Sequence, residues 1–381
     1  MTQTFLLAKN RLQDQDKYTC AYNESPSGWY WQPVTEYLLE KARTRRIRVY
    51  YPPERGQVVL RTELDWELDV LPADSGDSFT EFEVASNRPY LYVTPCLNIG
   101  DDAIWAGGPH SLVLMTAAGT RDIYPFFFGA RRGEITEPIE FDSALLERQH
   151  KLRVYLPPGY GENPMRTYPV LYMHDGKNLF FPKEAFLGRE WGVDATLALL
   201  DQMNAADQII VVAIYSMDRE NEYTQPGYER HGRSVVEEVK PRIDEMFQTK
   251  RDAASTAVMG SSLGGVASFY MAWEWPHVFG TAVCLSSTFS TQDNLMERVL
   301  REPKRDIQIY IDSGWPGDNY EVSLAMAVAL IERGYEYGRD LMHYAFPLAE
   351  HSEPAWRERM HLPLQFFAGL PAVGSRRKHG R

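Results

Sequence analysis

TAVMGSSLGGVASFY, residues 256–270, is the stretch that decides the fold of this chain. It joins a short apolar run, the pattern Gly-x-Ser-x-Gly and a helix-forming run, in that order. Small residues on both sides of Ser262 permit the tight strand-to-helix turn that raises a serine above the carboxyl edge of a parallel sheet. The bare pattern occurs by chance in roughly one chain of this length in eight. The prediction of a nucleophile therefore depends mainly on the strand-like and helix-like segments on either side. We predict that Ser262 is a nucleophile.

The segments around this stretch alternate between strand-like and helix-like patterns, which predicts a mostly parallel sheet flanked by helices. Several strand-like runs are apolar throughout, as in strands buried on both faces. The predicted strands are 152–156, 170–173, 209–215, 256–259, 282–285, 307–311 and 343–346. The predicted helices are 193–203, 235–247, 265–273 and 320–333. This order of elements around a serine turn is that of an α/β-hydrolase domain.

The N-terminal third has a different pattern, with short alternating or aromatic runs separated by turn residues, as in an antiparallel sandwich. Apolar residues at helical spacing predict a short helix over residues 34–42. The predicted strands here are 57–60, 65–71, 79–84, 90–93 and 111–115. Charges, a glycine and a proline interrupt both patterns within residues 130–139. We expect a smaller β-sandwich-like domain over residues 1–132, the α/β-hydrolase domain over 133–370 and a disordered basic tail over 371–381.

The charge balance excludes several classes of partner. The chain has 52 acidic and 40 basic residues, a formal net charge of -12, which repels phosphate backbones and anionic lipids. Residues 1–10 lack a signal-peptide core, so we expect a cytoplasmic protein that binds neither nucleic acid nor membranes. The sequence leaves open whether two chains form a homodimer. Three widely spaced cysteines, Cys20, Cys96 and Cys284, are expected to be free thiols.

A serine nucleophile needs a general base, itself oriented by an acid, and in this fold the chain order is serine, acid, histidine. His351 follows the last predicted strand in a loop, where such a base belongs. The acid should follow the strand at 307–311, where Asp312 and Asp318 are the two candidates. We prefer Asp318, because Asp312 lies so close to the strand end that it suits the capping of the turn. Both remain open.

No further group is required for this chemistry. The sequence has no H-E-x-x-H, no C-x-x-C and no phosphate-binding loop, so we expect no metal and no organic cofactor.

Four motifs occur in the order found in one known family. They are VLYMHDGKNLF at residues 170–180, RENEY at 219–223, GSSLGG at 260–265 and HSEPAWR at 351–357. Over roughly residues 141–369 the chain resembles the "Putative esterase" family of α/β-hydrolases, which includes enterochelin, feruloyl and acetyl-xylan esterases and S-formylglutathione hydrolase. Lys177 stands where glutamine is usual in that family. The β-rich domain ahead of the hydrolase resembles the layout of the siderophore-esterase branch.

The resemblance implies an oxyanion hole formed by the backbone N–H groups of Leu263 and Gly176. It also implies that Asp175, Lys177 and Arg219 lie near the substrate, and we add Trp191 as a residue suited to an aryl or sugar ester. An Arg219 to Glu222 ion pair that only braces the loop is an equal alternative. For the N-terminal aromatic residues, packing is favoured over a ligand platform; they are Trp29, Trp31, Trp66, Trp105 and residues 126–128.

These inferences predict a serine hydrolase that cleaves carboxylic esters through an acyl-enzyme. The physiological ester is left open between a siderophore and an aryl or sugar ester. Two alternatives also stay open, namely an acyltransferase on the same fold and a catalytically silent ligand-binding module.

Overall fold

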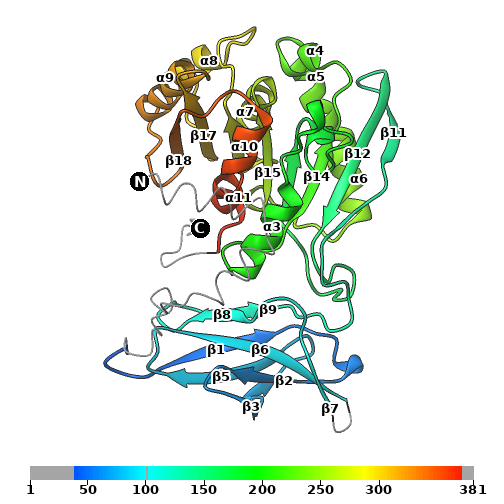
Figure 1. Ribbon diagram of the computed structural model, residues 1–381, viewed down its shortest axis with the longest axis vertical. Helices are drawn as coiled ribbons and strands as arrows, with labels where there is room; N and C mark the ends of the chain where they lie inside the picture. Colours follow the sequence, from blue (N-terminus) through cyan, green and yellow to red (C-terminus); the bar gives the residue numbers. More distant parts are fainter. Residues whose placement is uncertain (1–37, 100–101, 371–381) are drawn as a thin grey trace. The chain divides into compact units, whose positions relative to one another are not determined.

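The computed structural model describes residues 38–99 and 102–370 (Figure 1). Spatial contacts divide the chain into two compact units, Met1–Phe127 and Phe128–Arg381, and each is described by itself. Within the described residues, no helix has both the length and the apolar character needed to cross a membrane.

The N-terminal unit contains two sheets that share one hydrophobic core. One sheet has the order β4-β5-β1-β9, and the other has the order β3-β2-β6-β7 with β8 also paired to β6. Ile47 and Phe82 from the first sheet and Leu60 and Leu91 from the second are fully buried in the same cluster. The strands are β1 Arg43–Val49, β2 Gln57–Thr62, β3 Asp65–Val70, β4 Asp74–Ser75, β5 Thr80–Ser86, β6 Tyr90–Ile99, β7 Asp102–Trp105, β8 Ser111–Leu114 and β9 Arg121–Ile123. The predicted sandwich-like domain is confirmed.

The helix predicted over residues 34–42 is wrong in its described part, and residues 34–37 lie outside the described residues. Residues 38–42 lead into β1 without a helical turn. The backbone N–H of Leu39 donates to the carbonyl of Asn87, and the Leu39 side chain packs against the sandwich core. Tertiary contacts therefore override the helical spacing of the apolar residues. Trp29 and Trp31 also lie outside the described residues.

The C-terminal unit is built on a mixed sheet of order β10-β12-β14-β13-β15-β16-β17-β18, with β11 paired to β12. From β14 to β18 all neighbours are parallel, whereas β10, β11 and β14 each pair antiparallel with β12. The strands are β10 Glu134–Ile135, β11 Ile139–Ser143, β12 Arg148–Leu156, β13 Val170–Met173, β14 Ile210–Ile214, β15 Thr256–Ser261, β16 Thr281–Leu285, β17 Gln308–Trp315 and β18 Leu341–Pro347. The predicted α/β-hydrolase fold is confirmed, and each predicted strand of this unit is present.

Helices cover both faces of this sheet. The helices are α3 Val193–Gln202, α4 Arg219–Tyr223, α5 Gly227–Ser234, α6 Lys240–Met246, α7 Leu263–Glu274, α8 Leu295–Arg301, α9 Tyr320–Glu332, α10 Glu353–Arg359 and α11 His361–Ala368. Side chains of α3, α10 and α11 share one core cluster with alternate strand residues, and those of α6 to α9 share the other. The predicted helix at 235–247 is the end of a longer run, because a π-helical segment, Val235–Val239, joins α5 to α6.

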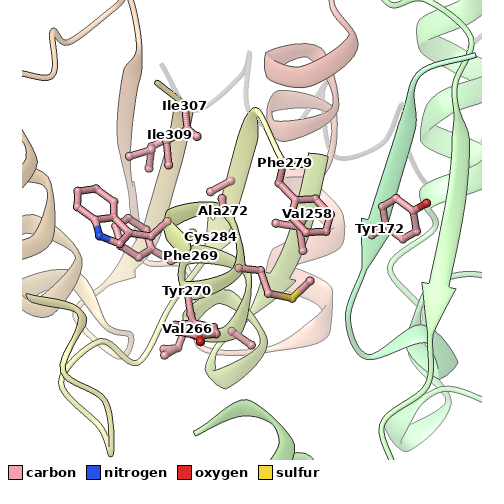
Figure 2. Close-up of a cluster of buried hydrophobic side chains, with 14 of the residues drawn as sticks. Tyr172, Val258, Val266, Phe269, Tyr270, Ala272, Phe279, Cys284, Ile307 and Ile309 are labelled. Atoms are coloured by element: carbon pink, nitrogen blue, oxygen red, sulfur yellow. The ribbon is translucent and has the colours of Figure 1, made fainter. Parts of the chain in front are cut away.

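The helix that follows the serine turn is enclosed by the sheet and its neighbours. Every residue of α7 from Gly264 to Trp273 is buried. Figure 2 shows Val266, Phe269 and Ala272 of this helix packed against Val258 of β15 and Cys284 of β16. Because its position is set by this core, α7 gives the preceding serine a rigid support.

Candidate active site

Ser262 occupies the turn between β15 and α7 in a strained backbone conformation. Its φ is 56° and its ψ is -123°, outside the favoured regions for an L-residue. A Cβ atom on Gly260 would lie 2.4 Å from the Gly264 carbonyl group, so this turn requires glycine there. The Ser262 N–H donates to the carbonyl of Leu285 at 2.8 Å, which ties the turn to β16. The serine is 8% exposed. This is the geometry of a nucleophile elbow.

His351 and Asp318 meet beyond the ends of two neighbouring parallel strands. Asp318 follows β17, His351 follows β18, and the His351 Nδ1 lies 2.7 Å from the Asp318 Oδ1. A carboxylate at this distance fixes the proton on Nδ1 and leaves Nε2 as the basic nitrogen. The His351 side chain is 33% exposed, and the Trp356 ring packs edge-on against it with 5.2 Å between ring centroids. Among the described residues, no hydrogen bond joins His351 to Ser262.

The Asp318 carboxylate is fully buried and accepts four hydrogen bonds. Oδ1 accepts from His351 and from the Asn319 N–H at 2.7 Å. Oδ2 accepts from the Gly314 N–H at 2.7 Å and from the Ser286 hydroxyl. Burial acts to raise the pKa of this carboxyl, but the donors outweigh burial and lower the pKa to about 2. Asp318 is therefore an anion throughout the physiological range.

Asp312, the alternative acid, is occupied by other partners. It lies in β17, fully buried, and its two oxygens accept from the Arg359 Nε and Nη2 at 3.1 and 3.0 Å. The Tyr310 hydroxyl donates to the same carboxylate at 3.0 Å. Burial raises the Asp312 pKa, with Arg359 opposing that shift. The structure thus brings Asp318, and not Asp312, to His351.

A second loop, after β13, lies beside the serine turn. The His174 N–H donates to the Met259 carbonyl at 2.9 Å, and a Cβ atom on Gly264 would lie 3.2 Å from the Asp175 carboxylate. Asp175 has a left-handed conformation, with φ 55°, and Gly176 begins a short 3₁₀ helix, Gly176–Asn178. A Cβ atom on Gly176 would lie 2.7 Å from the Ala213 backbone, so only glycine fits. Gly176 and Leu263 each open a helix, which leaves their N–H groups without an intrahelical acceptor.

Arg219 links this loop to the serine turn. Its Nε donates to both Asp175 oxygens, at 2.9 and 3.1 Å, and its Nη2 donates to the Ser261 carbonyl at 3.2 Å. The alternative ion pair of Arg219 with Glu222 is wrong, because Glu222 instead pairs with Arg148, whose Nη2 lies 2.6 Å from the carboxylate. The arginine therefore holds two backbone segments that carry the expected oxyanion donors.

Arg219→Gln is expected to lower kcat for ester hydrolysis about tenfold to a hundredfold while KM changes by less than threefold. Loss of the Asp175 pair frees the Gly176 N–H from its fixed direction, and a misdirected oxyanion donor weakens transition-state binding selectively. Steady-state kinetics with a p-nitrophenyl ester measure both constants, and Arg230→Gln on the next helix is the control. A raised KM for this uncharged ester with an unchanged kcat would contradict the role of Arg219 in holding the loop.

Two of the four residues expected near the substrate have other surroundings. Trp191 is 0% exposed and packs edge-on against Trp356, with 5.6 Å between ring centroids, so it offers no side-chain surface to a ligand in this structure. Its indole completes the core beneath α10. Asp175 is buried in its pair with Arg219, whose side chain is 36% exposed. Lys177 is exposed. Only Lys177 and Arg219 thus offer substantial side-chain surface to a ligand.

A pair of buried histidines beneath the loop was not anticipated. The Ser268 hydroxyl donates to the Gly264 carbonyl at 2.8 Å, so it accepts from the His174 Nδ1 at 3.0 Å. The His174 Nε2 is then an acceptor and receives the Nε2–H of His231 at 3.1 Å. Burial lowers the pKa of His174 to about 3 and that of His231 well below its ordinary value. Both imidazoles are neutral. The HDG motif contains His174, but nothing in the sequence marks its partner 57 residues later.

The free energy of unfolding is expected to fall as the pH is lowered from 7 to 5. His150 is also buried, with a pKa lowered by burial to about 4, so three imidazoles stay neutral in the folded protein. The unfolded chain binds a proton at each below about pH 6.5, at a cost to stability of about 1.4 kcal/mol per pH unit for each histidine. Urea unfolding at several pH values measures the slope of the unfolding free energy against pH.

The His150→Leu variant provides the matched comparison. The His150 Nε2 lies 3.6 Å from the Glu238 carboxylate, beyond hydrogen-bond distance, so leucine breaks no hydrogen bond within the described part of the chain. In His150→Leu the dependence of the unfolding free energy on pH should become shallower, whereas His277→Gln, at an exposed position, should leave it unchanged. Equal slopes in all three proteins would contradict the neutral state of these imidazoles in the fold.

Comparisons with known proteins place the chain in a family. The model of the family described as "Putative esterase" matches residues 143–366, more than half of the chain. An endo-1,4-beta-xylanase/feruloyl esterase of Xylanibacter ruminicola is 27% identical over 207 residues, which cover 52% of this chain and 27% of that protein. The chain thus spans about a quarter of the length of this curated relative.

Two solved structures show the same fold. A ferulic acid esterase has a TM-score of 0.54 and 17% identity, covering 62% of this chain and 98% of that one. The enterobactin esterase of Shigella flexneri has a TM-score of 0.52 and 15% identity, covering 90% of this chain and 98% of that one. At such identities the likeness establishes the fold alone. The family assignment rests on the family model, which matches more than half of the chain, and the chain belongs to the "Putative esterase" family.

Proposed function

We propose that this protein hydrolyses carboxylic esters with Ser262 as nucleophile, His351 as general base and Asp318 as the acid that orients the base. The observation that supports this most is the 2.7 Å contact between His351 Nδ1 and an ionised, fourfold hydrogen-bonded Asp318. Ser262 stands on a nucleophile elbow at the carboxyl end of β15, in the same parallel sheet. The family assignment agrees with this chemistry.

In the proposed mechanism, the Ser262 Oγ attacks the ester carbonyl carbon while the His351 Nε2 takes the hydroxyl proton. The N–H groups of Leu263 and Gly176 donate to the oxyanion of the tetrahedral intermediate. The C–O bond to the alcohol breaks as His351 returns the proton to the leaving oxygen, which leaves an acyl-enzyme. Water, deprotonated by the same histidine, then attacks the acyl carbon, and the bond to the Ser262 Oγ breaks as His351 returns the proton to that oxygen, which releases the carboxylic acid and restores the serine. Contacts between serine and base tighten when substrate is bound.

The substrate that we propose is a small-molecule ester that enters beside Arg219 and Lys177. The Lys177 side chain is exposed next to the loop that carries Gly176, and the Arg219 side chain, paired with Asp175, is 36% exposed, so the two cations favour an ester with anionic or phenolic oxygens near the reacting carbonyl. The xylanase/feruloyl esterase relative and the ferulic acid esterase structure are named for feruloyl esters, and the other structural neighbour is named for enterobactin. These names support, for this chain, an aryl-acid ester as the first class to test.

The test is hydrolysis of methyl ferulate, methyl 2,3-dihydroxybenzoate, methyl hexanoate and p-nitrophenyl acetate by the full-length chain. Turnover of the aryl-acid esters with kcat/KM at least tenfold above that of methyl hexanoate is expected. A burst of p-nitrophenol equal to the enzyme concentration would reveal the acyl-enzyme. Turnover of none of the four esters by folded protein would overturn the proposed function and favour a ligand-binding module.

A further inference from the structure

We propose that Ser286 is a positioning residue that holds the acid of the triad, and that Asp312 keeps the charge of Arg359 away from that acid. This inference rests on the proposed function. The residues come from three separate segments. Ser286 directly follows β16, Asp312 lies in β17, and Arg359 ends α10. All three are buried.

The Ser286 hydroxyl can act in only one way. Its oxygen lies 2.9 Å from the Trp356 Nε1 and 2.7 Å from the Arg359 Nη2. Indole and guanidinium nitrogens are donors without acceptor capacity, so these two groups occupy both lone pairs of the hydroxyl. The single hydroxyl proton is thereby directed to the remaining neighbour, the Asp318 Oδ2. The serine thus serves as an obligate donor to the acid.

With this donor in place, every acceptor position on Asp318 is filled. The Gly314 N–H shares Oδ2 with Ser286, and the Asn319 N–H shares Oδ1 with His351. A protonated carboxyl would have to lose one of these bonds. The arrangement fixes both the ionisation of Asp318 and the direction from which it meets the imidazole, as supporting hydrogen bonds do in other preorganised sites.

The charge of Arg359 is balanced by Asp312 rather than by Asp318, the acid of the triad. The Arg359 Nη2 lies 3.8 Å from the Asp318 Oδ2, but it lies 3.0 Å from the Asp312 Oδ1 and the Nε binds the second oxygen. The Arg359 charge is thus paired with Asp312 in a side-on, bidentate geometry. Without that counterion, a buried positive charge would face Asp318 and weaken its attraction for the protonated form of His351.

The charge balance predicts a specific set of results for the His351 titration. In Asp312→Asn, the unpaired arginine should move the midpoint of the imidazole titration down by about one pH unit. Adding Arg359→Met to that variant removes the unpaired charge and should return the midpoint to the wild-type value. Asp318 contacts the imidazole, and Glu350 and Glu353 are the acidic residues nearest to His351 in the sequence. None of these is changed.

The measurement is an NMR titration of the full-length chain with labelled histidine, with His351 assigned from a His351→Gln spectrum. Arg357→Met is the matched control, because Arg357 lies on the same helix but pairs with Glu190. Its midpoint should equal that of the wild type. A purely structural role would not be rescued by a second core substitution, so recovery in the double variant separates the two explanations. An unmoved midpoint in Asp312→Asn, or no recovery in the double variant, overturns the inference.

Ser286→Ala supplies an independent kinetic readout. It should lower kcat about tenfold to a hundredfold with KM nearly unchanged, because Ser286 is fully buried and acts through Asp318. Full activity in a folded Ser286→Ala protein would overturn the positioning role. A wild type that turns over no ester would overturn the proposed function, and the NMR titration, which needs no substrate, would still decide the charge arrangement.

Discussion

Ser262→Ala is expected to lower kcat for p-nitrophenyl acetate by about 10⁵-fold. The strained elbow and the buried α7 remain in this variant, so the loss reflects the missing nucleophile rather than unfolding. Removal of the serine from other catalytic triads has effects of this size, and the residual rate comes from binding and the oxyanion donors. Stopped-flow and steady-state assays on enzyme purified free of host esterases measure the change.

The neighbouring serine supplies the control for this experiment. Ser261 is fully buried at the end of β15, and its contact with Arg219 uses the backbone carbonyl, which alanine retains. Ser261→Ala should therefore keep at least a third of wild-type activity. If the two variants lose activity equally, or if Ser262→Ala stays active, Ser262 is not the nucleophile.

Asp318→Asn is expected to lower kcat by about 10³- to 10⁴-fold without a comparable change in KM. An amide in place of the carboxylate can donate to His351 and so favours the wrong tautomer, with the proton on the nitrogen that should act as base. The asparagine oxygen can keep the contact with the Gly314 amide, but its NH2 group then faces the Asn319 N–H, so the melting temperature, measured by calorimetry, should also fall.

Asp312→Asn is the matched comparison for the acid. The same chemical change six residues earlier in the chain leaves the His351 contact intact, so kcat at the pH optimum should fall less than tenfold. A larger loss for Asp312→Asn than for Asp318→Asn would reverse the assignment of the acid.

The fold was largely predictable because the strands of the C-terminal sheet are buried on both faces. Alternate residues of β15 contribute to different core clusters, Val258 to one and Met259 to the other, which makes the whole strand apolar in the sequence. The antiparallel pairing of β12 with β14 was not anticipated, because a single strand's pattern does not specify its neighbour.

The sequence could locate the residues of the candidate site that are marked by a local pattern. It left alternatives open where a residue's role depends on contacts with distant segments. The elbow at Ser262 and the loop histidine at 351 could be located from local patterns. The choice between Asp312 and Asp318 depends on Arg359, more than forty residues later, which binds the first of them. The sequence also did not indicate that Trp191 is buried, since a tryptophan in a loop can pack into a core as readily as it can contact a ligand.

The most direct test of the account is labelling of the full-length protein with an alkyl fluorophosphonate, followed by peptide mapping by mass spectrometry. The account predicts one label per chain, on Ser262, in the wild type and in Ser261→Ala, and none in Ser262→Ala. A wild-type protein that is folded but unlabelled, or that carries the label on another residue, would contradict it.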